Sequence, residues 1–313
     1  MLPDAAHPER GSFVRDQVAA LRRLPGLDVE LYEFPPGPRA LALAAVHLRR
    51  VYGPARGAGA GGARAAFGVV HAHFGLTAWP ALAVRARVRA LTLHGTDLAH
   101  ARTRAATVAA LRYVDLLATV SAPLVDALPR RARGRARVLP CGVDLARFVP
   151  IARADARHEL GLAPYRPYLL FAADPARPEK RQDRALEIAR DARVELLTLG
   201  GVDPERVPLW INAANAVLVP SEREGFGLAV LEALACEVPV LATPVGVHEA
   251  ALAGVAGTLC APYDQRSWHA ALAPHLAASE PRVQGRERAR EYSAAAMAER
   301  VAEAWRAACE RCG

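Results

Sequence analysis

Apolar residues fall into short runs along the chain, separated by stretches in which they recur every three or four residues. Continuous apolar runs at 168–172 and 216–219 are typical of strands buried on both faces of a parallel sheet. The stretches between such runs have the spacing of amphipathic helices. Alternation of this kind favours an α/β fold with helices on both sides of the sheet. The expected strands are 29–32, 69–72, 90–93, 116–120, 137–139, 168–172, 194–198, 216–219, 238–242 and 257–259. The expected helices are 12–24, 41–52, 77–86, 98–112, 122–128, 183–192, 226–235, 247–253, 267–278 and 286–308.

The alternation runs twice, and a connection rich in proline and arginine at 147–166 separates the two rounds. A chain of 313 residues is long enough for two domains of about 150 residues each. We therefore expect two Rossmann-like domains that face each other across a cleft. The predicted parts are an N-terminal domain at 1–150, a C-terminal domain at 151–290, and a last helix at 291–313 that packs back on the first domain.

The N-terminal domain lacks the strand with which a doubly wound domain should open. Its first element is a helix that Ser12 can cap, preceded by a loop. Two explanations stay open from the sequence: the true start lies upstream, or the strand has been lost. A glycine-rich stretch at 53–66 is expected to be flexible.

Composition excludes several classes of protein. No apolar run of about 18 residues is present and the first residues show no apolar stretch, so we expect neither a transmembrane helix nor a signal peptide. Five irregularly spaced cysteines indicate a reducing compartment. Residues 1–150 carry 21 basic and 10 acidic residues, and the remainder carries 19 and 22. A basic first half suits a phosphate-bearing acceptor or an anionic membrane. The arginine run at 130–137 has no interleaved aromatic residues, so we expect no nucleic-acid partner.

Lys180 is the one lysine among 40 basic residues, and the other 39 are arginines. A lysine retained in such a chain indicates a site that needs a compact ammonium rather than a planar guanidinium. Lys180 and Arg177 follow the strand at 168–172, where they can bind a pyrophosphate and stabilise charge on a leaving group.

The strongest motif is SEREGFGLAVLEALACEVPVLATPVG at 221–246, a turn with two glycines between a buried strand and a helix. Glycines allow backbone amides to approach a ligand, and the start of a helix favours negative charge. Glu224 and Glu232 are eight residues apart, and if Glu232 lies two turns into the helix, a rise of about 1.5 Å per residue separates them by about 12 Å. Carboxylates accept paired hydrogen bonds from vicinal hydroxyls, which a hexose and a ribose both present.

This motif resembles the E-x7-E signature of the retaining glycosyltransferases of the GT-B fold, the large family called group 1 or family 4. The resemblance implies that Glu224 contacts the donor sugar and that Glu232 binds the ribose of the nucleotide. It also implies that four residues of the turn contact the sugar and phosphate through their backbone. These residues are Gly225, Phe226, Gly227 and Leu228.

Other segments match the same family. The loop with Lys180 resembles G-R-x-x-x-x-K, although Ala173 and Asp174 replace its Gly-Arg pair, so Arg177 is the expected substitute and Arg181 the second choice. The segment TLHGTDL resembles T-x-H-G-[ST]-D, and His94 is the matching histidine near the donor sugar.

In the first domain, the resemblance also places Gly11 and Ser12 in the loop that faces the donor phosphate. His73 and Asp97 are neighbours of His94 without an assigned role, and His71 joins them in a metal site that is conceivable but not expected, because the family is generally metal-independent.

The resemblance implies a cytoplasmic bacterial enzyme of glycan biosynthesis that uses a UDP- or GDP-linked sugar as co-substrate and no cofactor. The acceptor would be a sugar, a lipid-linked glycan or a small molecule, and we expect reversible contact with the anionic inner face of the cell membrane. A same-face transfer is favoured, in which the departing phosphate held by Lys180 and Arg177 takes the acceptor's proton. Two alternatives remain: a GT-B sugar-nucleotide epimerase, and a non-catalytic scaffold of polysaccharide assembly.

Overall fold

A computed structural model describes residues 11–53 and 67–312. The flexible stretch expected before residue 67 lies almost wholly outside these residues. The described chain divides into two compact units. The first unit comprises residues 11–53, 67–140 and 297–312, and the second comprises residues 141–296.

The first unit is built on a four-stranded parallel sheet with the order β1-β2-β3-β4. β3 has the sequence LLAT and is buried at every position, as expected for a strand that helices cover on both faces. The strands are β1 (Phe67–His73), β2 (Ala86–Leu93), β3 (Leu116–Thr119) and β4 (Ala136–Val138).

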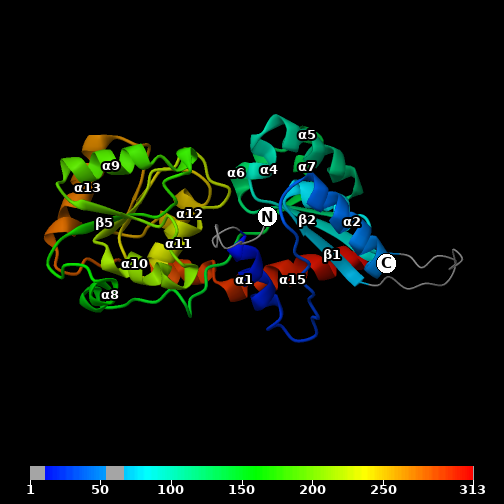
Figure 1. The fold of residues 1–313 in the computed structure, drawn as a ribbon, viewed down its shortest axis with the longest axis horizontal. Helices are drawn as coiled ribbons and strands as arrows, with labels where there is room; N and C mark the ends of the chain where they lie inside the picture. Colours follow the sequence, from blue (N-terminus) through cyan, green and yellow to red (C-terminus); the bar gives the residue numbers. More distant parts are fainter. Residues whose placement is uncertain (1–10, 54–66, 313) are drawn as a thin grey trace, which may run out of the picture. The chain divides into compact units, whose positions relative to one another are not determined.

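Helices cover both faces of this sheet. Leu91, Leu93 and Leu117 point to one face and pack with α3, α4, α5 and α7, while α1 and α15 lie on the other face (Figure 1). The helices are α1 (Ser12–Leu21), α2 (Pro38–Tyr52), α3 (Ala78–Ala81), α4 (Thr96–Ala99), α5 (Ala101–Ala110), α6 (Ala122–Asp126), α7 (Arg130–Arg133) and α15 (Ala294–Arg311), with 3-10 turns at Gly75–Thr77 and Leu111–Tyr113.

The second unit has a five-stranded parallel sheet with the order β6-β5-β7-β8-β9. Every residue of β5 and β7 is buried, in agreement with their continuous apolar sequences YLLF and AVLV. The strands are β5 (Tyr168–Phe171), β6 (Glu195–Thr198), β7 (Ala216–Val219), β8 (Val240–Ala242) and β9 (Leu259–Cys260).

The helices of the second unit also form two layers. Ala185 and Ile188 of α9 pack with Trp268 and Leu272 of α13 against one face, and α10 and α11 lie on the other (Figure 1). The helices are α8 (Arg153–Leu160), α9 (Gln182–Asp191), α10 (Val207–Ala213), α11 (Leu228–Ala235), α12 (His248–Leu252), α13 (Gln265–Ala277) and α14 (Arg286–Glu291), with 3-10 turns at Pro178–Lys180 and Pro204–Arg206.

The helix predicted at 286–308 is divided into α14 and α15, and two further predictions about these elements are also wrong. The segment 29–32 alternates apolar and polar residues, but it forms no strand, because no neighbouring strand of the described chain pairs with it. The connection at 147–166 contains helix α8, whose Arg153 and Arg157 are 4% and 3% exposed. Their guanidinium groups donate to backbone carbonyls and to Asn215, so these two arginines of the connection are structural.

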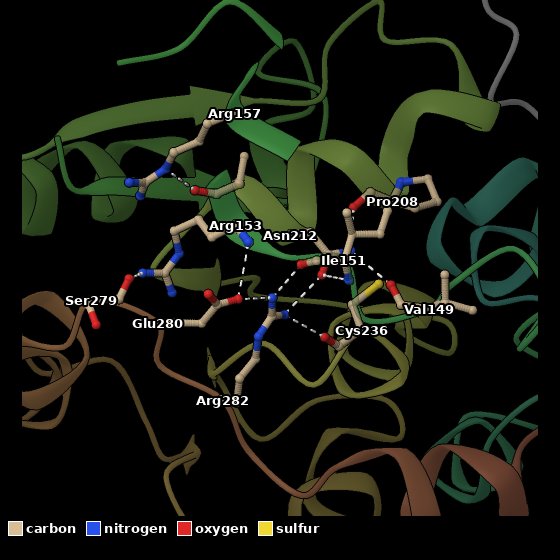
Figure 2. Close-up of polar contacts among 11 residues, drawn as sticks. Val149, Ile151, Arg153, Arg157, Pro208, Asn212, Cys236, Ser279, Glu280 and Arg282 are labelled. Atoms are coloured by element: carbon tan, nitrogen blue, oxygen red, sulfur yellow. Dashed lines mark hydrogen bonds and ion pairs between the residues drawn. The ribbon is translucent and has the colours of Figure 1, made fainter. Parts of the chain in front are cut away.

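A polar network joins this connection to the rest of the second unit (Figure 2). Arg282 donates to the carbonyl oxygens of Ile151 and Cys236, to Asn212 Oδ1 at 2.9 Å and to Glu280. Asn212 also accepts from the Ile151 amide and donates to the carbonyls of Val149 and Pro208. The network therefore satisfies the backbone of a segment that belongs to no strand.

Because Arg282 satisfies several acceptors at once, we expect Arg282→Met to lower the free energy of unfolding of the second unit by about 3 kcal/mol. The matched control is Arg290→Met, whose side chain is 62% exposed and forms an i,i+3 pair with Glu287. The control should change stability by less than about 0.5 kcal/mol. Urea unfolding of the two variants measures both values, and equal losses would contradict a structural role for the network.

Candidate active site

The loops after β5 and β7 meet at one edge of the second sheet. β5 pairs with β7 in parallel, with Leu170 opposite Val217, so the carboxyl ends of both strands lie at the same edge. Lys180 follows β5 and Glu224 follows β7. The Glu222 amide donates to the carbonyl of Glu179 at 2.9 Å, which fixes one loop against the other.

Lys180 and Glu224 form an ion pair in this position. The Nζ atom of Lys180 lies 2.7 Å from each carboxylate oxygen of Glu224, and the two side chains are only 13% and 8% exposed. Ser221 Oγ also donates to Glu224 Oε1 at 2.8 Å. The two residues that the sequence selected separately are thus in direct contact.

The pair holds Glu224 in its ionised form. Burial alone would raise the pKa of the Glu224 carboxyl, but the positive charge and hydrogen bonds of Lys180, with the hydroxyl of Ser221, outweigh burial and leave that pKa below its usual value. The site therefore presents one fixed cation and one fixed anion side by side.

The arginines of the same loop do not join the pair. Arg177 donates to Glu179 Oε1 at 2.7 Å, and its side chain is 48% exposed. Arg181 pairs with Asp183 and Glu222. Lys180 is thus the basic residue of this loop that contacts Glu224.

The turn before α11 and the loop after β8 pack against each other and each depend on a glycine, Gly227 in the turn and Gly246 in the loop. Gly227 has a φ of +100°, and a Cβ atom there would lie 2.3 Å from His248 Nε2. Gly246 has a φ of +64°, and a Cβ atom there would lie 2.2 Å from the carbonyl oxygen of Phe226. Gly225 precedes the buried Phe226, and Leu228 begins α11. The backbone of the turn is therefore packed too closely for any side chain at these glycines.

Glu232 is partly buried and lies on α11, about one turn after the start of the helix at Leu228. The helix begins at Leu228, so its positive end points toward the glycine turn. Negative charge on a ligand is favoured at that end.

His248 is a residue of this site that the sequence analysis did not select. Its side chain is fully buried, and Nδ1 lies 2.8 Å from the carbonyl oxygen of Thr243. A carbonyl only accepts, so Nδ1 carries the proton and Nε2 is an acceptor, with no hydrogen-bond partner among the described residues. Burial lowers the pKa of His248, and the nearby Glu224 raises it less than burial lowers it. In the sequence, the one indication of this residue was that the segment VGVHE contains a histidine.

A second cluster of predicted residues lies in the first unit, at the carboxyl ends of β1 and β2. His73 Nδ1 lies 3.1 Å from His94 Nε2, and Gln17 Nε2 lies 3.4 Å from His73 Nε2. An amide nitrogen only donates, so His73 accepts from Gln17 and donates to His94. The proton of neutral His94 is then on Nδ1, which makes that atom the donor available to a ligand.

Neighbouring residues hold His94 in place. The ring centroids of Phe13 and Phe74 each lie 4.7 Å from the ring centroid of His94. Asp97, 6% exposed, accepts from the amides of His94 and Gly75 at 2.6 and 2.7 Å. Asp97 thus has a structural role that the sequence did not reveal.

His71 belongs to the same cluster but has different partners. Its Nδ1 accepts from Trp305 Nε1 at 3.0 Å, and its Nε2 donates to Thr92 Oγ1 at 2.8 Å. Among the residues that the structure describes, no group of three or more ligands is placed to hold a metal ion.

The remaining predicted residues of the first unit lie at the start of α1. Gly11, with a φ of +71°, is the N-cap and Ser12 is the first residue of the helix, so the prediction that Ser12 caps it is wrong. The same helix carries Gln17, so α1 connects these two residues to the histidine cluster.

The close contact between Gly227 and His248 can be tested by Gly227→Ala. We expect a loss of about 1–2 kcal/mol from the positive φ, and a further 1–3 kcal/mol from overlap with the imidazole. The matched control is Gly254→Ala, where φ is +75° and a Cβ atom would meet nothing within 4 Å. Urea unfolding should show the larger loss for Gly227→Ala, and equal losses would refute the close contact.

The buried histidines predict a loss of stability in mild acid. Burial lowers the pKa of His73 from 6.5 to about 4, so stability is complete above pH 6.5 and is lost as the pH falls toward 4. At pH 5.5 one such histidine costs about 1.4 kcal/mol relative to pH 7.5. His73→Gln should reduce the difference in unfolding free energy between these two pH values by that amount.

The control for this experiment is His47→Gln, which removes an exposed imidazole on α2. The control should leave the difference between the two pH values unchanged. A pH dependence that is the same in wild type and His73→Gln would show that His73 titrates in the folded protein as it does in the unfolded chain.

Two family profiles match the chain. The profile of "Glycosyltransferase Family 4" matches residues 11–147, and the profile of "Glycosyl transferases group 1" matches residues 163–292. Together they include the histidine cluster, the Lys180–Glu224 pair and Glu232.

Curated relatives and solved structures agree with these profiles. The D-inositol 3-phosphate glycosyltransferase of Nocardia farcinica is 34% identical over 177 residues, which are 45% of this chain and 39% of that protein. The match thus spans about two fifths of the length of this curated relative. The sucrose-phosphate synthase of Thermosynechococcus elongatus is 22% identical, with a TM-score of 0.67 over 94% of this chain and 92% of that one.

A second solved structure, Anabaena Alr3699/HepE in complex with UDP and glucose, is 14% identical, with a TM-score of 0.67 over 96% of this chain and 97% of that one. At these identities the two structures establish the fold alone, which is that of two α/β units of the GT-B type. The profiles cover the two units one after the other, and they match the segments that carry the candidate site. The chain belongs to the group 1 / family 4 glycosyltransferases.

Proposed function

We propose that the protein transfers a hexose from a nucleotide-sugar donor to an acceptor hydroxyl and retains the configuration at the anomeric carbon. The observation that carries this proposal is the buried Lys180–Glu224 pair beside the glycine turn of α11. The names of the relatives support it, because they include D-inositol 3-phosphate glycosyltransferases, and HepE has been solved with UDP-glucose.

The donor can replace both partners of the ion pair at once. A nucleotide sugar carries an anionic diphosphate, which attracts the ammonium of Lys180, and sugar hydroxyls, which donate to the carboxylate of Glu224. Each charged group thus exchanges one charge-assisted partner for another. The ion pair keeps both side chains in position before the donor binds.

Other residues complete the donor site in this proposal. Glu232 accepts hydrogen bonds from the ribose hydroxyls, and the amides at 225–228 contact the sugar and phosphate. His94 donates from Nδ1 to a sugar hydroxyl, Gly11 and Ser12 face the phosphate, and Arg177 leaves Glu179 to assist Lys180. No cofactor is required, and the nucleotide sugar, carrying UDP or GDP, serves as co-substrate.

Transfer takes place on one face of the sugar. The bond between the anomeric carbon and the phosphate oxygen breaks, and its electron pair leaves with the nucleoside diphosphate. The acceptor oxygen forms the new bond from the same face, and its proton passes to the departing phosphate oxygen. Lys180 stabilises the charge that grows on this oxygen.

The acceptor in this proposal is a sugar, a lipid-linked glycan or a small molecule. No helix among the described residues is both long enough and apolar enough to cross a membrane.

The excess of basic residues before residue 150 favours reversible binding to anionic lipid, at about 1 kcal/mol for each well-placed arginine. Sedimentation with anionic vesicles should therefore show binding that high salt removes, and equal pelleting with neutral vesicles would contradict membrane attraction.

The proposal predicts different kinetic effects for two residues of the site. Lys180→Ala should lower kcat about 100-fold with a smaller effect on KM, because the charge that Lys180 stabilises grows toward the transition state. Glu232→Ala should raise KM for the donor about 10- to 100-fold, because it removes a charged acceptor worth about 1.5–3 kcal/mol. Transfer from labelled UDP- and GDP-sugars, measured with and without acceptor, provides both constants.

Two matched controls accompany these variants. Arg190→Ala removes an exposed cation of α9, and Glu287→Ala removes an exposed carboxylate of α14. Both should retain wild-type constants. A donor without ribose hydroxyls should remove most of the difference between wild type and Glu232→Ala.

The same assay separates the alternatives. Acceptor-dependent transfer supports the proposal, whereas release of nucleotide with a rearranged sugar and no need for acceptor would identify an epimerase. Absence of both transfer and donor binding would identify a non-catalytic scaffold. Product with inverted configuration would overturn the retaining mechanism alone.

A further inference from the structure

Three side chains of the first unit form one hydrogen-bonded chain, which begins on α1 and ends at His94. Gln17 is buried, its Nε2 lies 3.4 Å from His73 Nε2, and His73 Nδ1 lies 3.1 Å from His94 Nε2. β1 and β2 run parallel with His73 opposite Thr92, so His73 and His94 lie at the same edge of the sheet. Nδ1 of His94 has no hydrogen-bond partner among the described residues, so the chain ends at a nitrogen that a ligand can contact.

Both imidazoles of the chain are neutral near pH 7. Burial lowers the pKa of His73 to about 4, and burial, together with the neighbouring histidines, lowers the pKa of His94 well below its usual value. A neutral imidazole carries one proton, so one of its nitrogens donates and the other accepts. Each ring therefore passes on the direction of the hydrogen bond that it receives.

Gln17 sets this direction, because its amide nitrogen faces His73. An amide nitrogen only donates, so the hydrogen bonds run from Gln17 to His73 and from His73 to His94. A side chain at position 17 that only accepts would reverse both bonds and leave Nδ1 of His94 without its proton. A residue of α1 therefore determines, from two hydrogen bonds away, what His94 offers to a ligand.

The third histidine of the cluster does not compete for these bonds. His71 Nδ1 lies 3.0 Å from Trp305 Nε1, and His71 Nε2 lies 2.8 Å from Thr92 Oγ1, so both of its nitrogens are occupied. Its ring stacks on that of His73, with the ring centroids 4.7 Å apart. Among the described residues, the hydrogen-bond partners of the His73 ring are thus Gln17 and His94.

The backbone around the end of the chain is held in an unfavourable conformation. Phe74, whose ring centroid lies 4.7 Å from that of His94, has a φ of +72°, in a region that favours glycine. The hydroxyl of Thr77 lies 2.8 Å from the Phe74 carbonyl oxygen and helps to keep this turn in place. Backbone strain of this kind is typical of functional sites, where it fixes a side chain that the chemistry requires.

We propose that Gln17 is a positioning residue of the transfer reaction, which acts through His73 to make His94 a hydrogen-bond donor. His94 then contacts a ligand atom that accepts, a hydroxyl or phosphoryl oxygen, and disfavours a group that only donates, such as an ammonium. The identity of the ligand as a nucleotide sugar rests on the proposed function, whereas the direction of the chain does not.

The test uses the whole chain with nitrogen-15 in its histidine rings and spectra that show which ring nitrogen carries the proton. At about pH 8.5, where imidazoles are neutral, we expect the proton on Nδ1 of both His73 and His94 in the wild type. In Gln17→Glu the carboxylate only accepts, so we expect the proton on Nε2 of both rings. His73→Gln and His94→Gln assign the signals.

Two further variants separate the direction of the chain from simple loss of a contact. Trp305→Phe is the matched control, because it also removes one hydrogen bond to a histidine of the cluster. It should leave the protons of His73 and His94 on Nδ1. Gln17→Met keeps the size of the side chain without its polar group, and we expect both tautomers of His94 in that variant.

The consequence for a ligand is measured by calorimetry with UDP-glucose and with analogues in which fluorine replaces one sugar hydroxyl at a time. Fluorine can accept a hydrogen bond but cannot donate one. At one position, fluorine should weaken binding to the wild type less than about threefold and binding to Gln17→Glu at least about tenfold. If His94 contacts a phosphoryl oxygen instead, UDP-glucose itself should bind Gln17→Glu at least about tenfold more weakly.

Several results would overturn the proposal. A proton on Nε2 of His94 in the wild type, or the same tautomer in the wild type, Gln17→Met and Gln17→Glu, would show that Gln17 does not set the direction. Unchanged affinities of Gln17→Glu for UDP-glucose and every analogue would show that Nδ1 contacts no accepting atom of the donor. Absence of UDP-glucose binding to the wild type would count against the proposed function, and the spectra, which need no donor, would still decide the role of Gln17.

Discussion

The ion pair of Lys180 and Glu224 is the interaction on which the candidate site depends. Two charges with 13% and 8% of their side chains exposed are stable only because each satisfies the other, so each loop requires the other to be in place. The order of the parallel strands makes this contact possible, since β5 and β7 are neighbours and their loops leave at one edge. The order of the strands and the charges of the candidate site therefore depend on each other through these two side chains.

Close packing around the glycine turn extends this link. Ser221 contacts Glu224 through its hydroxyl and Thr243 through its carbonyl oxygen, and Thr243 in turn accepts from His248. The imidazole of His248 lies against Gly227, at the start of the helix that carries Glu232. The loops after β7 and β8 thus form one continuous set of contacts. We therefore expect substitutions in this set of contacts to affect the position of the Glu224 carboxylate.

Most of the architecture and most candidate residues could be predicted from the sequence, because buried parallel strands and a glycine turn leave strong local patterns. The Lys180–Glu224 contact could not be predicted, because it depends on β5 and β7 being neighbours in the sheet, and the sequence does not reveal the order of the strands. The segment 29–32 was mispredicted because a period of two reports the preference for a strand and not the presence of a partner. The structural role of Arg153 and Arg157 could not be predicted, since the carbonyls of Ser279 and Ala213 to which they donate lie far away in the sequence. His248 had no spacing or neighbour that marked it.

Lys180 is also the one ε-amine of this chain. An ammonium held by two carboxylate oxygens at 2.7 Å is a poor nucleophile, because it must first lose a proton and its partner. Acylating reagents will therefore react with it at a rate set by whatever occupies the carboxylate beside it. The extent of acylation at Lys180 therefore measures the occupancy of the candidate site. In this sequence the α-amino group is the one other aliphatic amine that competes for the reagent.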